Sequence, residues 1–271
     1  MILTLDRAII RRDDVGMTAP WWESFFDDDY ARVFDASLTP ARTAREVEGL
    51  LALLAPPANA RLLDAPCGYG RITRPLAERG FRVVGVDRAR PLLDRAEHER
   101  GALTTEQLRY VHQDLRTPLA DGDFDIALNL FSSIGYGSDD DDRAAIMTIA
   151  RALKPGGKLL IDTMHRDAIA AFSSHGFPPA ERLPDGTIFM EQPRLDVVTG
   201  RIENRWFWQG PNGGGQKSAS IRIYTIGELI ALVEQAGLRF LSLHRGCSPE
   251  PFVASGWNLG GRVGLVAERP L

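Results

Sequence analysis

The chain of 271 residues contains only two cysteines, Cys67 and Cys247, which lie far apart in the sequence. Neither belongs to a Cys-x-x-Cys motif, so the sequence predicts neither a disulfide framework nor a zinc site, and a reducing compartment fits it. A run of ~18 apolar residues, the sign of a membrane-spanning helix, is also missing. The first residues, MILTLDRAIIRRDD, lack the apolar core of a signal sequence. We therefore expect a cytoplasmic protein without a membrane partner.

The sequence also lacks clusters of basic residues. The formal charge at pH 7 is −4, so no overall positive field would attract a polyanion, and no Lys/Arg run supplies a local one. We therefore expect no nucleic-acid partner. With 44% hydrophobic and 25% charged residues, the composition is that of an ordinary globular protein. It leaves both a monomer and a homodimer open.

Short apolar, β-rich runs alternate with segments of helical character such as residues 71–80 and 141–157. Alternating strands and helices predict βαβ units and a parallel sheet. We expect an α/β fold of the Rossmann-like, doubly wound type, with a mostly parallel, seven-stranded sheet. Its strands are expected at residues 60–65, 81–87, 108–114, 124–130, 157–162, 238–245 and 261–268.

Two segments depart from this alternation. Residues 180–224 follow the fifth strand and alternate polar and apolar side chains, which predicts an insertion of antiparallel strands. Before the core, residues 20–34 carry aromatic side chains at spacings partly compatible with one helical face. We expect residues 1–40 to form an N-terminal extension and helical cap, and residues 41–269 to form the main domain with 180–224 as its lid.

Two helix starts carry recognisable signals. The acidic run Asp139 to Asp142 places negative charge at a helix N-terminus, where it is favourable, and consecutive acids in a helical turn point in different directions. The run therefore predicts a helix start, and we expect no metal. Thr225 and Glu228 have the spacing of a capping box.

Ligands of open parallel sheets bind where the strands end and the chain turns into the helices. Three acids occupy such positions, Asp64, Asp87 and Asp114. A dinucleotide would favour Gly-x-Gly-x-x-Gly after the first strand, but here the third glycine of that frame is missing. Asp64 is also a poor neighbour for a phosphate and a good one for an ammonium group. S-adenosylmethionine, which has an amine, a sulfonium and an adenosine but no phosphate, fits this loop.

In combination these motifs resemble those of the class I S-adenosylmethionine-dependent methyltransferases of the small-molecule type, over about residues 40 to 269. The stretch LLDAPCGYG resembles the family's first motif, with Pro66 in place of its first glycine, and VVGVDRA, VHQDL and LKPGGKLLID resemble later ones. The resemblance implies that Asp87 binds both ribose hydroxyls and that Asp114 receives the adenine amino group.

The resemblance also implies that Gly68 and Gly70 let the backbone approach the methionine portion of the cofactor. Cys67, in the same loop, is expected to be a small packed residue and not a nucleophile. In related enzymes a tyrosine of an N-terminal helix often reaches the cofactor. The residues expected at the cofactor are Tyr30, Asp64, Cys67, Gly68, Gly70, Asp87, Arg88, Asp114, Leu115 and Asn129.

Methyl transfer is an in-line displacement, so the protein must align an acceptor with the sulfonium and, where needed, remove a proton. His165 follows the fifth strand and is the predicted general base, because an unperturbed imidazole titrates near neutrality. A capping or solvent-facing histidine is the alternative. Tyr136 would orient the acceptor or its leaving proton, unless it is a packing lid. The residues expected at the acceptor are Trp21, Trp22, Trp206, Arg222 and Tyr224.

The expected acceptor is a small molecule of a biosynthetic pathway, with oxygen or nitrogen favoured over carbon. After the fourth strand Asn129 is followed by Leu130-Phe131-Ser132, whereas enzymes that methylate DNA amino groups carry Pro-Pro-Tyr there. Two other classes stay open. One is a protein that binds S-adenosylmethionine without methylating, since fold and cofactor do not fix the chemistry. The other is a nicotinamide oxidoreductase, which the missing third glycine disfavours.

Overall fold

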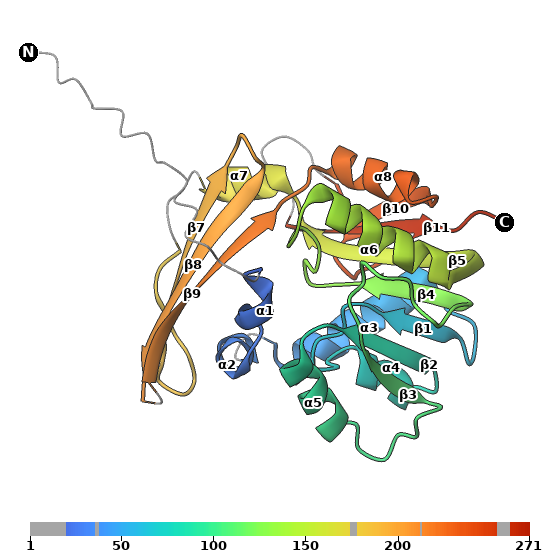
Figure 1. The fold of residues 1–271 in the computed structure, drawn as a ribbon, viewed down its shortest axis with the longest axis horizontal. Coiled ribbons are helices and arrows are strands. Elements are labelled where there is room, and N and C mark those ends of the chain that lie inside the picture. Colours follow the sequence, from blue (N-terminus) through green and yellow to red (C-terminus); the bar gives the residue numbers. More distant parts are fainter. Residues whose placement is uncertain (1–19, 36–37, 174–177, 212, 254–260) are drawn as a thin grey trace, which may run out of the picture.

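The computed structural model describes residues 20–35, 38–173, 178–211, 213–253 and 261–271. Its main sheet has seven strands in the order β10-β11-β5-β4-β1-β2-β3, and all are parallel except β11, which runs antiparallel to β5 and β10 (Figure 1). The predicted fold class is therefore confirmed. The strands are β1 (Arg61–Asp64), β2 (Arg82–Asp87), β3 (Leu108–His112), β4 (Phe124–Asn129), β5 (Leu153–Met164), β10 (Arg239–Arg245) and β11 (Arg262–Glu268).

Helices cover both faces of this sheet. α6 begins with a capping box between Ser138 and Asp141, and its first turn holds the acidic run, as predicted. The predicted capping box of Thr225 and Glu228 opens α8. The helices of the main domain are α3 (Pro40–Leu54), α4 (Thr73–Glu78), α5 (Arg90–His98), α6 (Asp139–Ala152), α7 (Arg166–Ser173) and α8 (Ile226–Gln235).

The two central leucines of β1 show how the sheet divides the core. Leu62 packs with Val47 of α3 on one face, and Leu63 packs in the cluster that includes Ile146 of α6 on the other. Each such buried side chain contributes about 1.5–3 kcal/mol. Strands covered on both faces are expected for a parallel sheet. The ends of the central strands are therefore held in place by packing on two sides, and the loops that follow them start from fixed positions.

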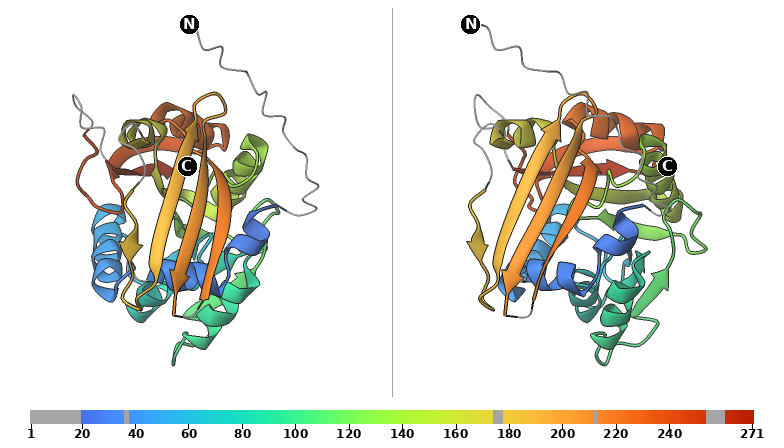
Figure 2. Two further views of the ribbon diagram at one scale, coloured as in Figure 1. Left: turned by 90° about the vertical axis from the view of Figure 1, so that its left-hand side faces the viewer. Right: turned by 60° about the vertical axis from the view of Figure 1, so that its left-hand side comes forward.

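The insertion forms a separate antiparallel sheet in the order β6-β7-β8-β9. As Figure 2 shows, this sheet stands apart from the main one, and the N-terminal cap lies between the two. Its strands are β6 (Glu181–Arg182), β7 (Ile188–Asp196), β8 (Arg201–Gly210) and β9 (Gly213–Arg222), and the cap consists of α1 (Trp22–Phe25) and α2 (Asp28–Asp35).

The cap packs on the insertion through a third hydrophobic cluster. Phe25 and Val33 of the cap are buried there with Trp206 and Ala219 of β8 and β9. The cap is helical, as expected, but it consists of two short helices. The domain boundaries given above stay a prediction, and residues 1–19 of the expected N-terminal extension lie outside the described residues. Within the described part of the chain, no helix combines the length and the apolar character that crossing a membrane requires.

Candidate functional site

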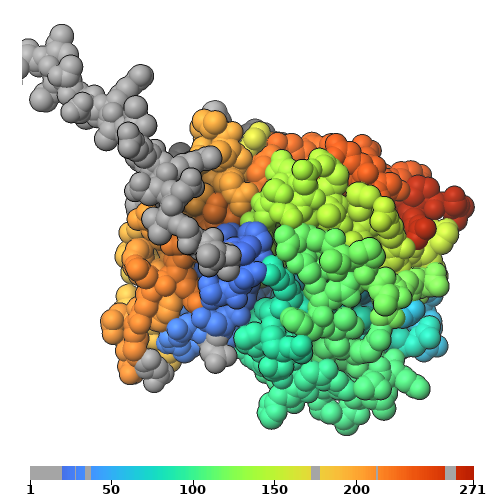
Figure 3. Space-filling view, in the orientation of Figure 1, coloured from blue at the N-terminus to red at the C-terminus, as the bar shows by residue number. Residues whose placement is uncertain are grey.

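A cavity of about 660 Å³ lies at the carboxyl ends of β1 to β4, with the cap as its opposite wall. Figure 3 shows the cap, in blue, against the segments that follow β2 and β3. Pockets for small ligands have volumes of roughly 300–1,000 Å³. Of the residues expected at a site, the following line this cavity: Trp22, Tyr30, Gly68, Asp87, Arg88, Asp114, Leu115 and Tyr136.

The loop after β1 and the acid that ends β2 are in direct contact. Gly68 and Gly70 have φ values of +57° and +83°, which favour glycine. The backbone N–H of Gly68 donates to Asp87 Oδ2 at 2.7 Å, and that of Ala89 donates to Oδ1 at 2.8 Å. Asp87 is only 8% exposed, and burial raises the pKa of its carboxyl. The carboxylate is thus fixed in orientation at the edge of the cavity.

Asp114, just beyond β3, is held by arginines. Arg116 donates to it through its backbone N–H and its side chain, with Nη2 2.7 Å from Oδ2, and this lowers the pKa of the Asp114 carboxyl. Arg116 Nη1 also lies 3.0 Å from Asp141 of α6. Arg88 Nη1 is 3.7 Å from Asp114 Oδ2 and its Nη2 pairs with Glu23 of α1. Arg88 thereby connects the cap to the end of β3.

Four residues expected at the cofactor do not line the cavity. Asp64 is 2% exposed, accepts from Thr73 Oγ1 at 2.7 Å, and burial raises its pKa to about 7. Cys67 is buried, and burial likewise raises the pKa of its thiol. Asn129 donates to the carbonyl of Ala65 at 2.9 Å. Gly70 lies under the hydroxyl of Tyr110. These four residues therefore contribute to the packing and hydrogen bonding of the loop after β1 and not to the cavity wall.

Aromatic rings form the wall nearest the cap. Tyr30, Phe26 and Tyr136 line the cavity, and the Phe26 ring is 4.9 Å from Tyr30 and 5.5 Å from Tyr136, between centroids. Burial raises the pKa of Tyr136 to about 12, so its hydroxyl stays protonated near neutrality. Trp21 and Trp206 were expected to touch the acceptor, but neither lines the cavity. Trp21 packs edge-on against Tyr136 at 5.3 Å, and Trp206 stacks on Tyr30 at 6.0 Å.

His165, the predicted general base, does not line the cavity either. It is 1% exposed, and its ring lies edge-on to Phe252 with 5.5 Å between centroids. β5 continues to Met164, past the expected end at residue 162, so His165 directly precedes α7. There the N–H of Arg166 donates to the carbonyl of Tyr224 at 2.8 Å. Its catalytic role stays a prediction.

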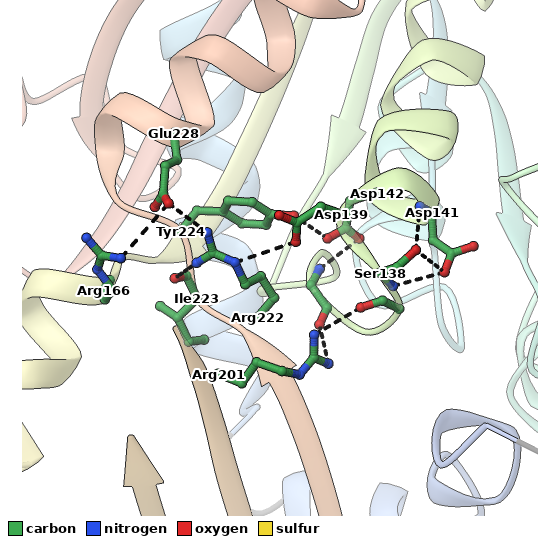
Figure 4. Close-up of polar contacts among 12 residues, drawn as sticks. Ser138, Asp139, Asp141, Asp142, Arg166, Arg201, Arg222, Ile223, Tyr224 and Glu228 are labelled. Atoms are coloured by element: carbon green, nitrogen blue, oxygen red, sulfur yellow. Dashed lines mark hydrogen bonds and ion pairs between the residues drawn. The ribbon is translucent and has the colours of Figure 1, made fainter. Parts of the chain in front are cut away.

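Arg222 and Tyr224 belong to a polar network beside the cavity and are not part of its wall (Figure 4). Arg222 Nη2 lies 2.7 Å from Glu228 Oε1, and its Nε lies 3.5 Å from Asp139. The Tyr224 hydroxyl donates to Asp142 Oδ2 at 2.6 Å. These contacts join the end of β9 to the starts of α6 and α8. Both residues therefore have structural partners that alternation along the strand does not reveal.

Sequence reasoning missed several residues of this region. Glu23, Phe26 and Arg116 line the cavity, and Arg201 of β8 donates to the loop after β4. The acids at strand ends follow a regular spacing, but Glu23 and Arg201 have no motif around them. Within the described residues no group of three or more His, Cys, Asp or Glu side chains is placed to hold a metal ion.

Residues 62–157, which include β1 to β4 and the loops at the cavity, match a family model described as "Methyltransferase domain". The chain is 30% identical over 177 residues to glycine N-methyltransferase of Rattus norvegicus, covering 59% of each chain. It is 32% identical over 117 residues to the S-adenosyl-L-methionine-dependent Diels-Alderase iliD of Neonectria sp. (strain DH2), covering 41% of each.

The alignments with the curated relatives span less than two thirds of the relatives' length. The likeness in structure is more extensive. The CcbJ methyltransferase of Streptomyces caelestis superimposes with a TM-score of 0.75 at 19% identity, covering 92% of this chain and 99% of that one. At this identity the likeness shows the fold, including the insertion that the family model does not reach.

Proposed function

We propose that the chain is a class I S-adenosylmethionine-dependent methyltransferase and that it transfers a methyl group from S-adenosylmethionine to a small-molecule acceptor, since residues 62–157 match a methyltransferase-domain model. The observation that carries the proposal is the cavity, which brings the glycine loop, two strand-end acids and an aromatic wall together. When bound, the cofactor supplies an electrophilic methyl group on a sulfonium.

The residues at the ends of β2 and β3 fit an adenosine. Asp87 is fixed by two backbone N–H donors, and a carboxylate has about four acceptor positions, so it retains capacity for ribose hydroxyls. Asp114 lies at the same end of the cavity, but the backbone N–H, Nε and Nη2 of Arg116 already donate to both of its oxygens, so it has less spare capacity for an amino group than Asp87. Gly68 brings the backbone to the cavity surface. We therefore place the adenosine at this end, and the methionine portion beside Gly68.

The aromatic wall is the part of the site suited to the acceptor. Tyr30, Phe26 and Tyr136 line the cavity beside the cap, and an acceptor held against these rings would be shielded from water on that side, which strengthens polar interactions with it. Because Tyr136 stays protonated near neutrality, its hydroxyl serves as a hydrogen-bond donor that orients an acceptor atom and is a poor base. Alignment of the acceptor is thus the chief contribution of these side chains.

The acceptor is proposed to be methylated on nitrogen or oxygen, in a biosynthetic pathway. The likeness to glycine N-methyltransferase supports a small amine as the first class to test. The experiment incubates the protein with S-adenosylmethionine and pools of small amines and alcohols, and mass spectrometry detects products heavier by one methyl group. Asp87→Ala serves as the control. No methylated product from either pool, with cofactor binding intact, would contradict the proposal.

A second candidate is a protein that uses bound S-adenosylmethionine without consuming it. The likeness to a Diels-Alderase that depends on S-adenosylmethionine supports this second candidate. The two functions differ in one measurable product, because only methyl transfer forms S-adenosylhomocysteine. The structure gives no support to a nicotinamide oxidoreductase. Thr73 occupies the position of the third glycine in the dinucleotide-binding motif, and its hydroxyl donates a hydrogen bond to Asp64.

A further inference from the structure

We propose that Arg201 is a positioning residue that fixes the loop carrying Tyr136 into the cavity. Arg201 is the first residue of β8 in the insertion, whereas residues 130–138 connect β4 to α6 in the main domain. Its Nη2 donates to the carbonyls of Tyr136 at 3.1 Å and Gly135 at 3.3 Å, and its Nη1 donates to that of Gly137 at 3.0 Å. One side chain thus binds three successive carbonyls of the loop. Figure 4 shows the Arg201 side chain pointing toward the loop that precedes Ser138.

The Arg201 guanidinium is also held by residues of the insertion itself. Its Nε donates to Ser220 Oγ at 2.8 Å, and Nη2 donates to the Ser220 carbonyl at 2.6 Å. Ser220 Oγ in turn donates to Glu203 Oε1 at 2.6 Å. Because a guanidinium is planar, with donors in fixed directions, these contacts set both the distance and the angle between the loop and the insertion.

Gly135 shows that the loop is fitted closely to the insertion at this point. Its carbonyl accepts from the N–H of Arg222 at 2.7 Å, and its own N–H donates to Asp142 Oδ1 at 3.0 Å. It has φ +91°, and a Cβ there would collide with the backbone of Arg222. The residue next to it, Tyr136, is the one whose ring lines the cavity.

The two ends of the cavity differ in their dependence on Arg201. Tyr136 depends on the insertion for its place, whereas Asp87 and Asp114 follow β2 and β3 and make no contact with Arg201 in the described structure. Removal of Arg201 should therefore displace the Tyr136 end of the cavity and leave the adenosine end intact. A role of Arg201 in aligning the acceptor rests on the proposed function. The displacement of Tyr136 on removal of Arg201 does not depend on that function.

The test follows Tyr136 in the full chain labelled with 3-fluorotyrosine. The chain has five tyrosines, so five ¹⁹F resonances are expected, and Tyr136→Phe identifies the one of interest. Arg201→Met removes all the donors. Arg205→Met is the matched control, because Arg205 is an exposed arginine on the same strand. We expect the Tyr136 resonance to move in R201M and not in R205M, and to move less in Arg201→Lys, which keeps one donor group.

Calorimetry with S-adenosylhomocysteine complements the spectra. We expect its Kd to stay within about 3-fold of wild type in both variants, a difference below the 1.4 kcal/mol that a tenfold change represents. An unmoved Tyr136 resonance in folded R201M would overturn the proposal, as would equal shifts of all five resonances. Should R201M not fold, the same comparison with R201K decides. Neither measurement needs turnover, so the positioning role and methyl transfer can fail separately.

Discussion

At the scale of single residues, the cofactor assignment depends most on Asp87. Its carboxylate already receives two backbone N–H groups that hold it at the cavity, and hydrogen bonds to a charged group are worth about 1.5–3 kcal/mol. We expect Asp87→Ala to weaken S-adenosylhomocysteine binding by that amount in calorimetry, roughly 10-fold to 150-fold. Asp94→Ala, an exposed acid on α5, is the control. Equal affinities of the two variants would remove Asp87 from the site.

The buried carboxyl of Asp64 predicts how the stability of the protein depends on pH. Its folded pKa of about 7 lies above the usual 3.8, so between these values the folded state binds a proton that the unfolded chain has lost. This contribution to stability is present at low pH and disappears as pH rises through 7. We expect urea unfolding to show Asp64→Asn gaining stability relative to wild type from pH 5 to pH 8, by at most about 1.4 kcal/mol per pH unit. Parallel pH curves for the two proteins would contradict the raised pKa.

Which residues sequence reasoning found depended on how local their signals are. Asp87 ends β2 and Asp114 lies two residues beyond β3, and both line the cavity. Asp64 ends a strand too, but its side chain turns to Thr73, because the loop beyond it bends over its carboxylate. Arg201 meets a carbonyl 64 positions earlier in the chain, and no motif predicts such a pair.

At the scale of elements, the ion pair between Glu23 of α1 and Arg88 links the cap to the cofactor end of the cavity. Both side chains are more than a third exposed, and such pairs contribute no more than about 1 kcal/mol and weaken with salt. We expect Glu23→Gln to weaken S-adenosylhomocysteine binding by up to about 5-fold at low salt, with the difference lost at 1 M salt.

The control for this element is Glu48→Gln on α3, whose ion pair with Arg79 does not line the cavity. A loss of affinity in Glu23→Gln that persists unchanged at 1 M salt would show that the residue acts through packing and not through charge. The aromatic spacing at 20–34 predicted a helical cap but not its interruption into α1 and α2. At the break, Asp27 Oδ1 accepts from the N–H of Tyr30 at 3.1 Å, so the Asp27 side chain caps the start of α2.

The whole molecule consists of two sheets with the cap between them. Alternation correctly predicted an antiparallel insertion after the fifth strand, and its role as a lid stays a prediction. The direct partner of its inner face is the cap: the ring of Trp206 lies 4.9 Å from that of Phe25, as well as 6.0 Å from Tyr30. Strand periodicity identifies which side chains share a face, but it cannot identify what that face packs against.

This arrangement predicts that the insertion acts on the site by holding the cap. Trp206→Ala removes a ring that is 4% exposed, and losses of this kind cost about 3–5 kcal/mol of packing. We expect faster amide hydrogen exchange over residues 22–35 and weaker S-adenosylhomocysteine binding, because Tyr30 and Glu23 line the cavity. Exchange in β1 and β4 should stay slow, since their partners are unchanged.

Trp208→Ala is the matched control for the whole-molecule prediction, because Trp208 is equally buried on the same face of β8 but lies outside the cluster that holds the cap. It should also lose packing energy, yet exchange over 22–35 should change much less than in Trp206→Ala. Equal acceleration in both variants would mean that the insertion stabilises the cap only through its own folding. A cap unaffected in either variant would mean that it is held by the main sheet alone, through contacts such as that between Glu23 and Arg88.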